Sequence, residues 1–172
     1  MRPIIGIIGA GEDLCTKKMY NFGLELGHSL LAEGYRIVTG GKSGIMEAVS
    51  RGGMNSESYF EGSIIGILPE ENKNSANDFC DIVIPTGFGI NRNSVIINTA
   101  DVIIAIGGGS GTLSEIAFAW QKNKKVLCVE QFEGWSGKLA GETLDNRNKD
   151  ILIGVNEIEE IIDYLRNLFS RN

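Results

Sequence analysis

The strongest chemical signal in the sequence is the glycine-rich segment IGGGSGTLSE at residues 106–115. It directly follows an apolar run and directly precedes a helical pattern that begins near Thr112. Glycines let the backbone turn through positive φ, and the first turn of a helix leaves unpaired N–H groups at the positive end of the helix dipole. Such a loop predicts a cradle for an anion such as phosphate. The residues expected to bind it are Gly108, Gly109, Ser110, Gly111 and Thr112.

Two side chains near this loop have alternative interpretations. Thr112 and Glu115 fit the capping-box pattern, in which the first caps the helix and the second returns to the backbone of the cap. Alternatively, Glu115 faces a ligand. Arg92, in the segment GINRNSVI, offers a planar fork of donors that suits phosphate or carboxylate, although a surface or helix-capping arginine fits the pattern as well.

A second glycine loop, GGKSG at residues 40–44, follows an apolar run and opens a helical pattern. Its Gly-Lys-Ser resembles the end of a P-loop, but the first glycine of that motif would fall on Arg36, inside a predicted strand. We expect instead a helix start that lines the same crevice, with Lys42 or Ser43 available to a ligand, or with Lys42 solvated. The expected ligand contacts are Gly40, Gly41, Lys42, Gly44 and Met46.

The first loop carries only two glycines of the dinucleotide fingerprint, Gly9 and Gly11, and its third position is Leu14. The second predicted strand ends Val38-Thr39 without a carboxylate for a ribose 2′-hydroxyl, so ordinary NAD binding is not expected. Gly9 and Gly11 are nevertheless predicted to approach the ligand.

The elements that must position these loops are short apolar runs that alternate with helical patterns. Uninterrupted apolar strands are typical of a parallel sheet covered by helices on both faces. The alternation predicts an α/β fold, namely a three-layer, doubly wound, Rossmann-like domain with a mostly parallel sheet of about seven strands. Loops at the carboxyl ends of its strands should converge at the switch point. The predicted strands are residues 4–8, 36–39, 63–68, 81–84, 102–106, 126–130 and 151–154.

Composition limits the range of partners. A chain of 172 residues fits one domain, residues 1–172, and a net charge of −6 gives no basic footprint for nucleic acid. No segment approaches the roughly 20 apolar residues of a membrane span. Three cysteines without close spacing and one histidine form no recognisable metal site, and they favour a reducing, cytoplasmic location. The polar segments 70–80 and 131–149 are expected to be loops, either at the rim of a site or simply at the surface.

The sequence also allows an expectation for two cysteines and the single histidine. Cys15 lies near the first loop and is either a thiol nucleophile or a small core residue, whereas Cys128 is expected in the core. His28 falls on the helix face opposite Leu26 and Leu30 and is expected to be solvated.

The chain resembles the Rossmann-like family that includes the Lonely Guy cytokinin-activating phosphoribohydrolases, often labelled lysine-decarboxylase-like, and the molybdenum cofactor carrier proteins. Phosphoribohydrolases of this family carry P-G-G-x-G-T-x-x-E, which falls on Gly107 through Glu115 with glycine in place of proline. Their Arg-Lys pair falls on Arg92 and Asn93, so Arg92 and Glu115 match the family's catalytic pair. Asn93, and Glu47 in place of a family glycine, resemble instead the nucleotide-binding and cofactor-carrier branch. The matching segments are GGKSGIMEAVSRGG at 40–53, IIGILPEE at 64–71, NRN at 91–93 and GGGSGTLSE at 107–115.

This resemblance implies a binding or carrier protein for a phosphate-bearing, nucleotide-like ligand, either a purine nucleotide or a pterin such as the molybdenum cofactor, with no further cofactor required. The alternative is a phosphoribohydrolase that cleaves the N-glycosidic bond of a nucleoside 5′-monophosphate to free base and ribose 5-phosphate. Arg92 would then hold the substrate, and Glu115 would stabilise the ribosyl cation or orient water. The resemblance also implies a homodimer or higher homo-oligomer, packed through helices around residues 92–98 and 113–120.

Overall fold

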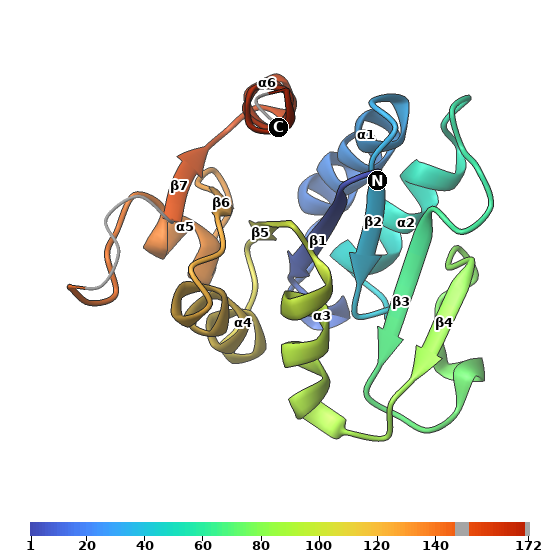
Figure 1. The fold of residues 1–172 in the computed structure, drawn as a ribbon. Coiled ribbons are helices and arrows are strands. Elements are labelled where there is room, and N and C mark those ends of the chain that lie inside the picture. Colours follow the sequence, from blue (N-terminus) through green and yellow to red (C-terminus); the bar gives the residue numbers. More distant parts are fainter. Residues whose placement is uncertain (147–151, 171–172) are drawn as a thin grey trace.

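The computed structural model describes residues 1–146 and 152–170, and Figure 1 shows their arrangement. The strands are β1 (Ile4–Gly9), β2 (Arg36–Thr39), β3 (Ile64–Leu68), β4 (Ile82–Pro85), β5 (Val102–Ile106), β6 (Val126–Val129) and β7 (Leu152–Val155). The helices are α1 (Lys17–Ala32), α2 (Ile45–Met54), α3 (Asn93–Thr99), α4 (Ser110–Gln121), α5 (Trp135–Leu139) and α6 (Ile158–Phe169). Short 3₁₀ turns occupy Glu12–Leu14, Lys73–Ser75 and Gly89–Arg92.

The seven described strands form one sheet in the order β4-β3-β2-β1-β5-β6-β7, and all of its pairings are parallel. The chain runs outward from β1 to β4, returns to β5 beside β1, and then runs outward again to β7. This order confirms the predicted doubly wound, Rossmann-like α/β fold. It places the switch point, where ligands bind in such sheets, between β1 and β5.

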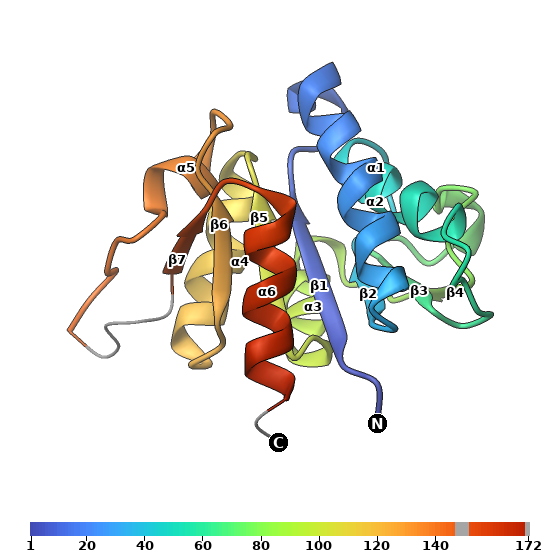
Figure 2. The same cartoon turned by 90° about the horizontal axis from the view of Figure 1, so that it is seen from above.

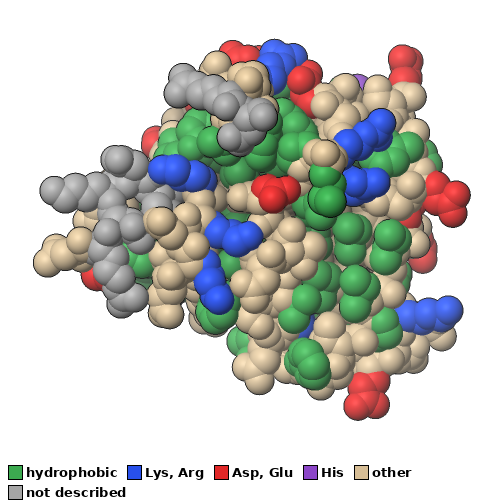
Figure 3. Space-filling view, viewed as in Figure 1, with side chains coloured by type: hydrophobic (Ala, Val, Ile, Leu, Met, Phe, Trp, Pro, Cys, Tyr) green, Lys and Arg blue, Asp and Glu red, His purple; other side chains and the backbone are tan. Residues whose placement is uncertain are grey.

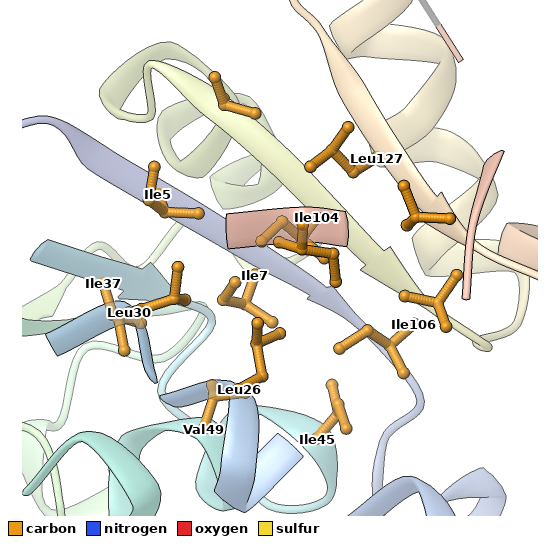
Figure 4. Close-up of a cluster of buried hydrophobic side chains, with 14 of the residues drawn as sticks. Ile5, Ile7, Leu26, Leu30, Ile37, Ile45, Val49, Ile104, Ile106 and Leu127 are labelled. Atoms are coloured by element: carbon orange, nitrogen blue, oxygen red, sulfur yellow. The ribbon is translucent and has the colours of Figure 1, made fainter. Parts of the chain in front are cut away.

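Two apolar layers sandwich the sheet because neighbouring strand residues point to opposite faces. On one face, alternate strand residues such as Ile7 and Ile104 pack against side chains of α1, α2 and α6, among them Leu26 and Leu30 of α1 (Figure 4). Figure 2 shows α1 and α6 on this same face. On the other face, strand residues such as Val38, Ile67 and Ile103 pack against side chains of α3 and α4, such as Ile97 and Ile116. Burial on both faces explains why the strands lack polar alternation.

The structure corrects several predicted boundaries. The segment 131–149, expected to be a loop, contains the helix α5, and its residues 147–149 lie outside the described part of the chain. The last strand runs from Leu152 to Val155, while Ile151, which was predicted to begin it, also lies outside the described residues. The segment 70–80 is irregular as expected, apart from the turn Lys73–Ser75. Among the described helices, none combines the length and the apolar character that a membrane crossing requires.

Candidate functional site

A crevice of about 510 Å³ opens at the carboxyl ends of β1 and β5, where the strand order reverses. The three glycine loops reach it, as the strand-end rule predicted, and the segment around Arg92 reaches it as well. The predicted residues that line it are Gly9, Gly11, Gly40, Met46, Arg92, Asn93, Gly109, Ser110, Gly111, Thr112 and Glu115. A larger hollow of about 650 Å³ lies between α1, α2 and the start of α6, and contains none of the predicted site residues.

The start of α4 forms the floor of the crevice. Gly107 and Gly108 turn the chain through φ of 60° and 89°, and the helix begins at Ser110 after Gly109. No side chain caps this helix start, so its first N–H groups remain available at the positive end of the helix dipole. The geometry therefore provides a place for an anion without a lysine.

The capping-box interpretation of Thr112 and Glu115 is wrong. The helix begins at Ser110 rather than near Thr112, so Thr112 lies within the first turn. Its hydroxyl donates instead to the carbonyl oxygen of Gly9 at 3.2 Å, which ties the start of α4 to the end of β1. Glu115 then falls one turn into the helix, where it is 7% exposed and lines the crevice.

Arg92 ends the turn Gly89–Arg92 and extends its guanidinium across the crevice to Gly40. An added Cβ at Gly40 would lie 2.6 Å from Cζ of Arg92, so the arginine occupies space that any larger residue would take. Its Nε is buried and has no hydrogen-bond partner among the described residues. Burial lowers the pKa of this guanidinium, and the nearby carboxylates of Glu115 and Glu70 act in the opposite direction. Arg92 is half-buried rather than a surface residue, and although it stands at the N-cap position of α3, its side chain makes no capping hydrogen bond.

Glu115 faces the same space as Arg92. Burial raises the pKa of its carboxyl to about 7, although the positive charge of Arg92 partly offsets the effect. Among the described residues, no hydrogen bond or ion pair within 4 Å holds this carboxyl. A group with a pKa near neutrality exists in both protonation states at physiological pH, so Glu115 is able to give or take a proton in the crevice.

Four predicted ligand contacts are not part of the crevice lining. The Nζ atom of Lys42 lies 2.8 Å from Oε1 of Glu70. Lys42 is therefore paired with a carboxylate at the surface and does not line the crevice. Gly41 packs against Gly66 and Leu68 on β3, and Gly44 packs against the backbone of the first loop. Gly108 packs against Thr112 in the α4 loop. These residues shape the loops that present their neighbours to the crevice.

Packing or exposure to solvent accounts for the remaining chemical candidates. Cys15 packs against the core beside α1, and burial, followed by the charge of Glu47, raises the pKa of its thiol. A raised pKa disfavours the thiolate, so Cys15 is not an activated nucleophile. Cys128 is fully buried and His28 is exposed, as expected. No group of three or more potential metal ligands occurs within residues 1–146 and 152–170.

Sequence reasoning missed the apolar part of the lining. Leu14, Pro69, Gly89 and Ile90 join the crevice, together with the β1 residues Ile7 and Ile8. Pro69 directly follows β3, so the rule that placed the glycine loops could have found it. Leu14 and Ile90 are 55% and 69% exposed, and an isolated apolar residue in a loop gives no signal of its role.

Known proteins share the fold and part of the sequence of this chain. The sequence profile of the SLOG cluster4 family matches residues 2–162. An uncharacterized protein of Archaeoglobus fulgidus is 39% identical over 126 residues, which cover 73% of this chain and 79% of that protein. The solved structure of the molybdenum cofactor binding protein from the phototrophic bacterium Rippkaea orientalis is 32% identical, covers 98% of both chains and gives a TM-score of 0.84. The molybdenum cofactor carrier protein of Chlamydomonas reinhardtii is 26% identical, with a TM-score of 0.82 over 98% of this chain and 99% of that chain.

Proposed function

The chain belongs to the SLOG cluster4 family, which confirms its resemblance to Lonely Guy and lysine-decarboxylase-like proteins, and on this basis we propose that it is a ligand-binding or carrier protein. Its ligand is a phosphate-bearing, nucleotide-like molecule, of the purine nucleotide or pterin class, held in the crevice between β1 and β5. The likeness to two solved proteins that bind or carry the molybdenum cofactor supports the pterin member of this class.

The observation that carries the proposal is the buried, unpartnered Nε of Arg92, an arginine that lines the same crevice as the uncapped start of α4. A buried donor without a partner costs roughly 1–3 kcal/mol, so a ligand oxygen that accepts from it removes a penalty already present in the fold. A phosphate at Gly109–Thr112 has the donors of the helix start on one side. Arg92 supplies a charge-assisted donor beside it.

The rest of the crevice suits a planar, largely apolar ring. Leu14, Met46 and Ile90 line it, while Asn93 and Glu115 supply polar groups for the ring edge or the sugar. Apolar walls with a few convergent polar groups are typical of small-molecule sites. The proposed ligand therefore binds with its phosphate at the start of α4 and its ring between these apolar side chains.

One observation favours a second function, hydrolysis of a nucleoside 5′-monophosphate: the buried Glu115 has a pKa raised to about 7. In that reaction water attacks C1′ while the bond to the base breaks. The ionised Glu115 stabilises the positive charge that develops on the ribose or accepts a proton from the attacking water, and the departing base takes up a proton. Arg92 holds the phosphate-bearing substrate.

Ligand binding and turnover can be measured separately. We would record thermal shifts with molybdopterin and with purine 5′-monophosphates, and follow base release from the nucleotides by chromatography. Stabilisation without base release supports the carrier function, whereas release that Glu115→Gln abolishes, and that the exposed control Glu57→Gln retains, establishes the hydrolase. If no phosphate compound stabilises the protein, the assignment of the crevice as an anion site is refuted.

A further inference from the structure

The turn that leads into α4 is held from outside the crevice by the start of α5. Gly107 and Gly108 directly follow β5, and their carbonyl oxygens accept from the N–H groups of Ser136 and Trp135, at 3.1 Å and 3.0 Å respectively. Gly134 packs against the same turn, because an added Cβ there would lie 2.6 Å from the carbonyl carbon of Gly107 and from the nitrogen of Gly108. None of these residues lines the crevice. Residues 134–136 therefore brace the turn from the side that a crevice ligand does not reach.

The Ser136 side chain joins the carboxyl ends of β5 and β6. Its hydroxyl oxygen accepts from the N–H of Gly107 at 2.6 Å, and its O–H donates to the carbonyl oxygen of Val129 at 2.9 Å. Val129 ends β6 and pairs in register with Ile106, the last residue of β5. The hydroxyl thus bridges the two strands just beyond their last paired residues. The side chain is fully buried, so both hydrogen bonds are shielded from water.

This contact leaves no mark on the surface of the molecule. Figure 3 shows exposed hydrophobic side chains gathered over β3 and β4, on the far side of the sheet from β6 and α5. Ser136 is buried instead, and a buried hydroxyl needs partners within the protein. One of its two partners, Gly107, begins the loop to α4.

The turn needs support from outside because its residues are glycines. Gly107 and Gly108 have φ of 60° and 89°, and glycine loses more conformational freedom on ordering than any other residue. The phosphoribohydrolase motif that the sequence resembles has proline at position 107. Proline is fixed at a φ of about −65° and has no N–H, so it could neither form this turn nor donate to Ser136. The restraint on the turn therefore comes from its hydrogen bonds to residues 134–136.

The same hydrogen bonds decide which backbone groups of the loop reach an anion. Carbonyl oxygens carry partial negative charge and repel an anion, whereas the N–H groups at a helix start attract it. The start of α5 engages the carbonyl oxygens of Gly107 and Gly108, and Ser136 engages the Gly107 N–H. The turn cannot swing these carbonyl groups toward the crevice without breaking those hydrogen bonds. The N–H groups at the start of α4 are then left to face the ligand.

We propose that Ser136 is a positioning residue of the crevice, because it holds the Gly107–Gly108 turn and so fixes the start of α4 as an anion site. The inference rests on the proposed function, since it requires an anion at Gly109–Thr112. Ser136 does not line the crevice and acts only through the turn. Loss of its hydroxyl should therefore weaken the recognition of a phosphate and leave the recognition of a ring unchanged.

Isothermal titration calorimetry with adenosine 5′-monophosphate, adenosine and inorganic phosphate tests this role. The ratio of the affinities for the nucleotide and the nucleoside isolates the contribution of the phosphate, which a general loss of stability does not change. We expect Ser136→Ala to lower this ratio, and the affinity for inorganic phosphate, by about 10-fold, which is the value of one buried hydrogen bond.

Ser63→Ala is the matched control for this measurement. The Ser63 side chain is equally buried and donates to Asp81, at the opposite end of the strands from the crevice. Its loss should leave the ratio and the phosphate affinity at the wild-type values. Ser136→Cys is a second variant at the site, because a thiol is only a weak donor and acceptor, and circular dichroism verifies that each variant is folded.

Hydrogen–deuterium exchange measures the brace without any ligand. Amides of residues 107–110 should exchange faster in Ser136→Ala than in the wild type, while those of α6 should not change. Folded variants at Ser136 that keep the wild-type exchange, ratio and phosphate affinity would overturn the positioning role and leave the anion site standing. A wild-type chain that binds neither inorganic phosphate nor the nucleotide in preference to the nucleoside would refute the anion site, and the positioning role with it.

Discussion

Replacing Glu115 with glutamine should stabilise the protein at alkaline pH and change it little at acid pH. Burial raises the pKa of this carboxyl from 4.5 to about 7 in the folded chain, whereas in the unfolded chain the carboxyl returns to its ordinary value. At about 1.4 kcal/mol per pH unit, this difference corresponds to a destabilisation of about 3 kcal/mol once the group is ionised in both states. Glutamine has a similar shape and no charge, so the variant escapes this destabilisation.

The sign follows from proton binding. Between pH 4.5 and about 7 the folded protein holds a proton on Glu115 that the unfolded protein has lost, so the free energy of unfolding falls as pH rises through this window. Above about pH 7 both states are ionised and the contribution becomes constant. The stabilising effect of Glu115→Gln should therefore grow across the window and then level off.

Urea unfolding of both proteins at about pH 5 and pH 8 measures this effect, because the contributions of all other groups cancel in the difference between them. The difference in unfolding free energy should increase by about 2–3 kcal/mol between the two pH values. Glu57→Gln, at an exposed position, should show no such increase. If the wild type and Glu115→Gln respond to pH in parallel, then Glu115 is not the buried, unpaired carboxyl described above.

Three substitutions test the crevice itself. Gly40→Ala should displace the Arg92 guanidinium and lower the affinity for the ligand detected by thermal shift by about 10- to 150-fold, which is the value of a charged hydrogen bond. The same substitution should lower the affinity little further in an Arg92→Ala background, and additive effects of the two substitutions would contradict this mechanism. Gly111→Val should also lower the affinity for the ligand but leave the unfolding free energy nearly unchanged, because an added Cβ there meets open space. Unchanged affinity would argue against the α4 start as the anion site. Thr112→Val should lower the unfolding free energy by about 1 kcal/mol through loss of its bond to Gly9, and urea unfolding would show whether that tie contributes.

The architecture can be predicted from the sequence because the same apolar residues that indicate the strands also indicate that the strands are buried. Apolar runs such as 102–106 have no polar alternation, which is typical of a parallel strand that is covered on both faces. The strand ends then place the glycine loops at one edge without any knowledge of side-chain contacts. Local patterns do not report long-range partners, however, and the Lys42–Glu70 pair joins two loops that are 28 residues apart. The residues next to Lys42 in the sequence therefore could not predict whether its side chain would be solvated or paired.

The same limit explains the error at Glu115. A capping box and a buried carboxylate one turn into a helix share the same sequence spacing, and only the residue at which the helix begins distinguishes them. Three consecutive glycines before Ser110 make that residue ambiguous in sequence, because each of them tolerates the conformation of a turn or of a cap. The tertiary bond from Thr112 to Gly9 resolves the ambiguity by fixing the α4 start against β1. With α4 starting at Ser110, Glu115 lies beyond the first turn of the helix, where its carboxyl lines the same crevice as Arg92 and is close enough for the charge of Arg92 to lower its pKa.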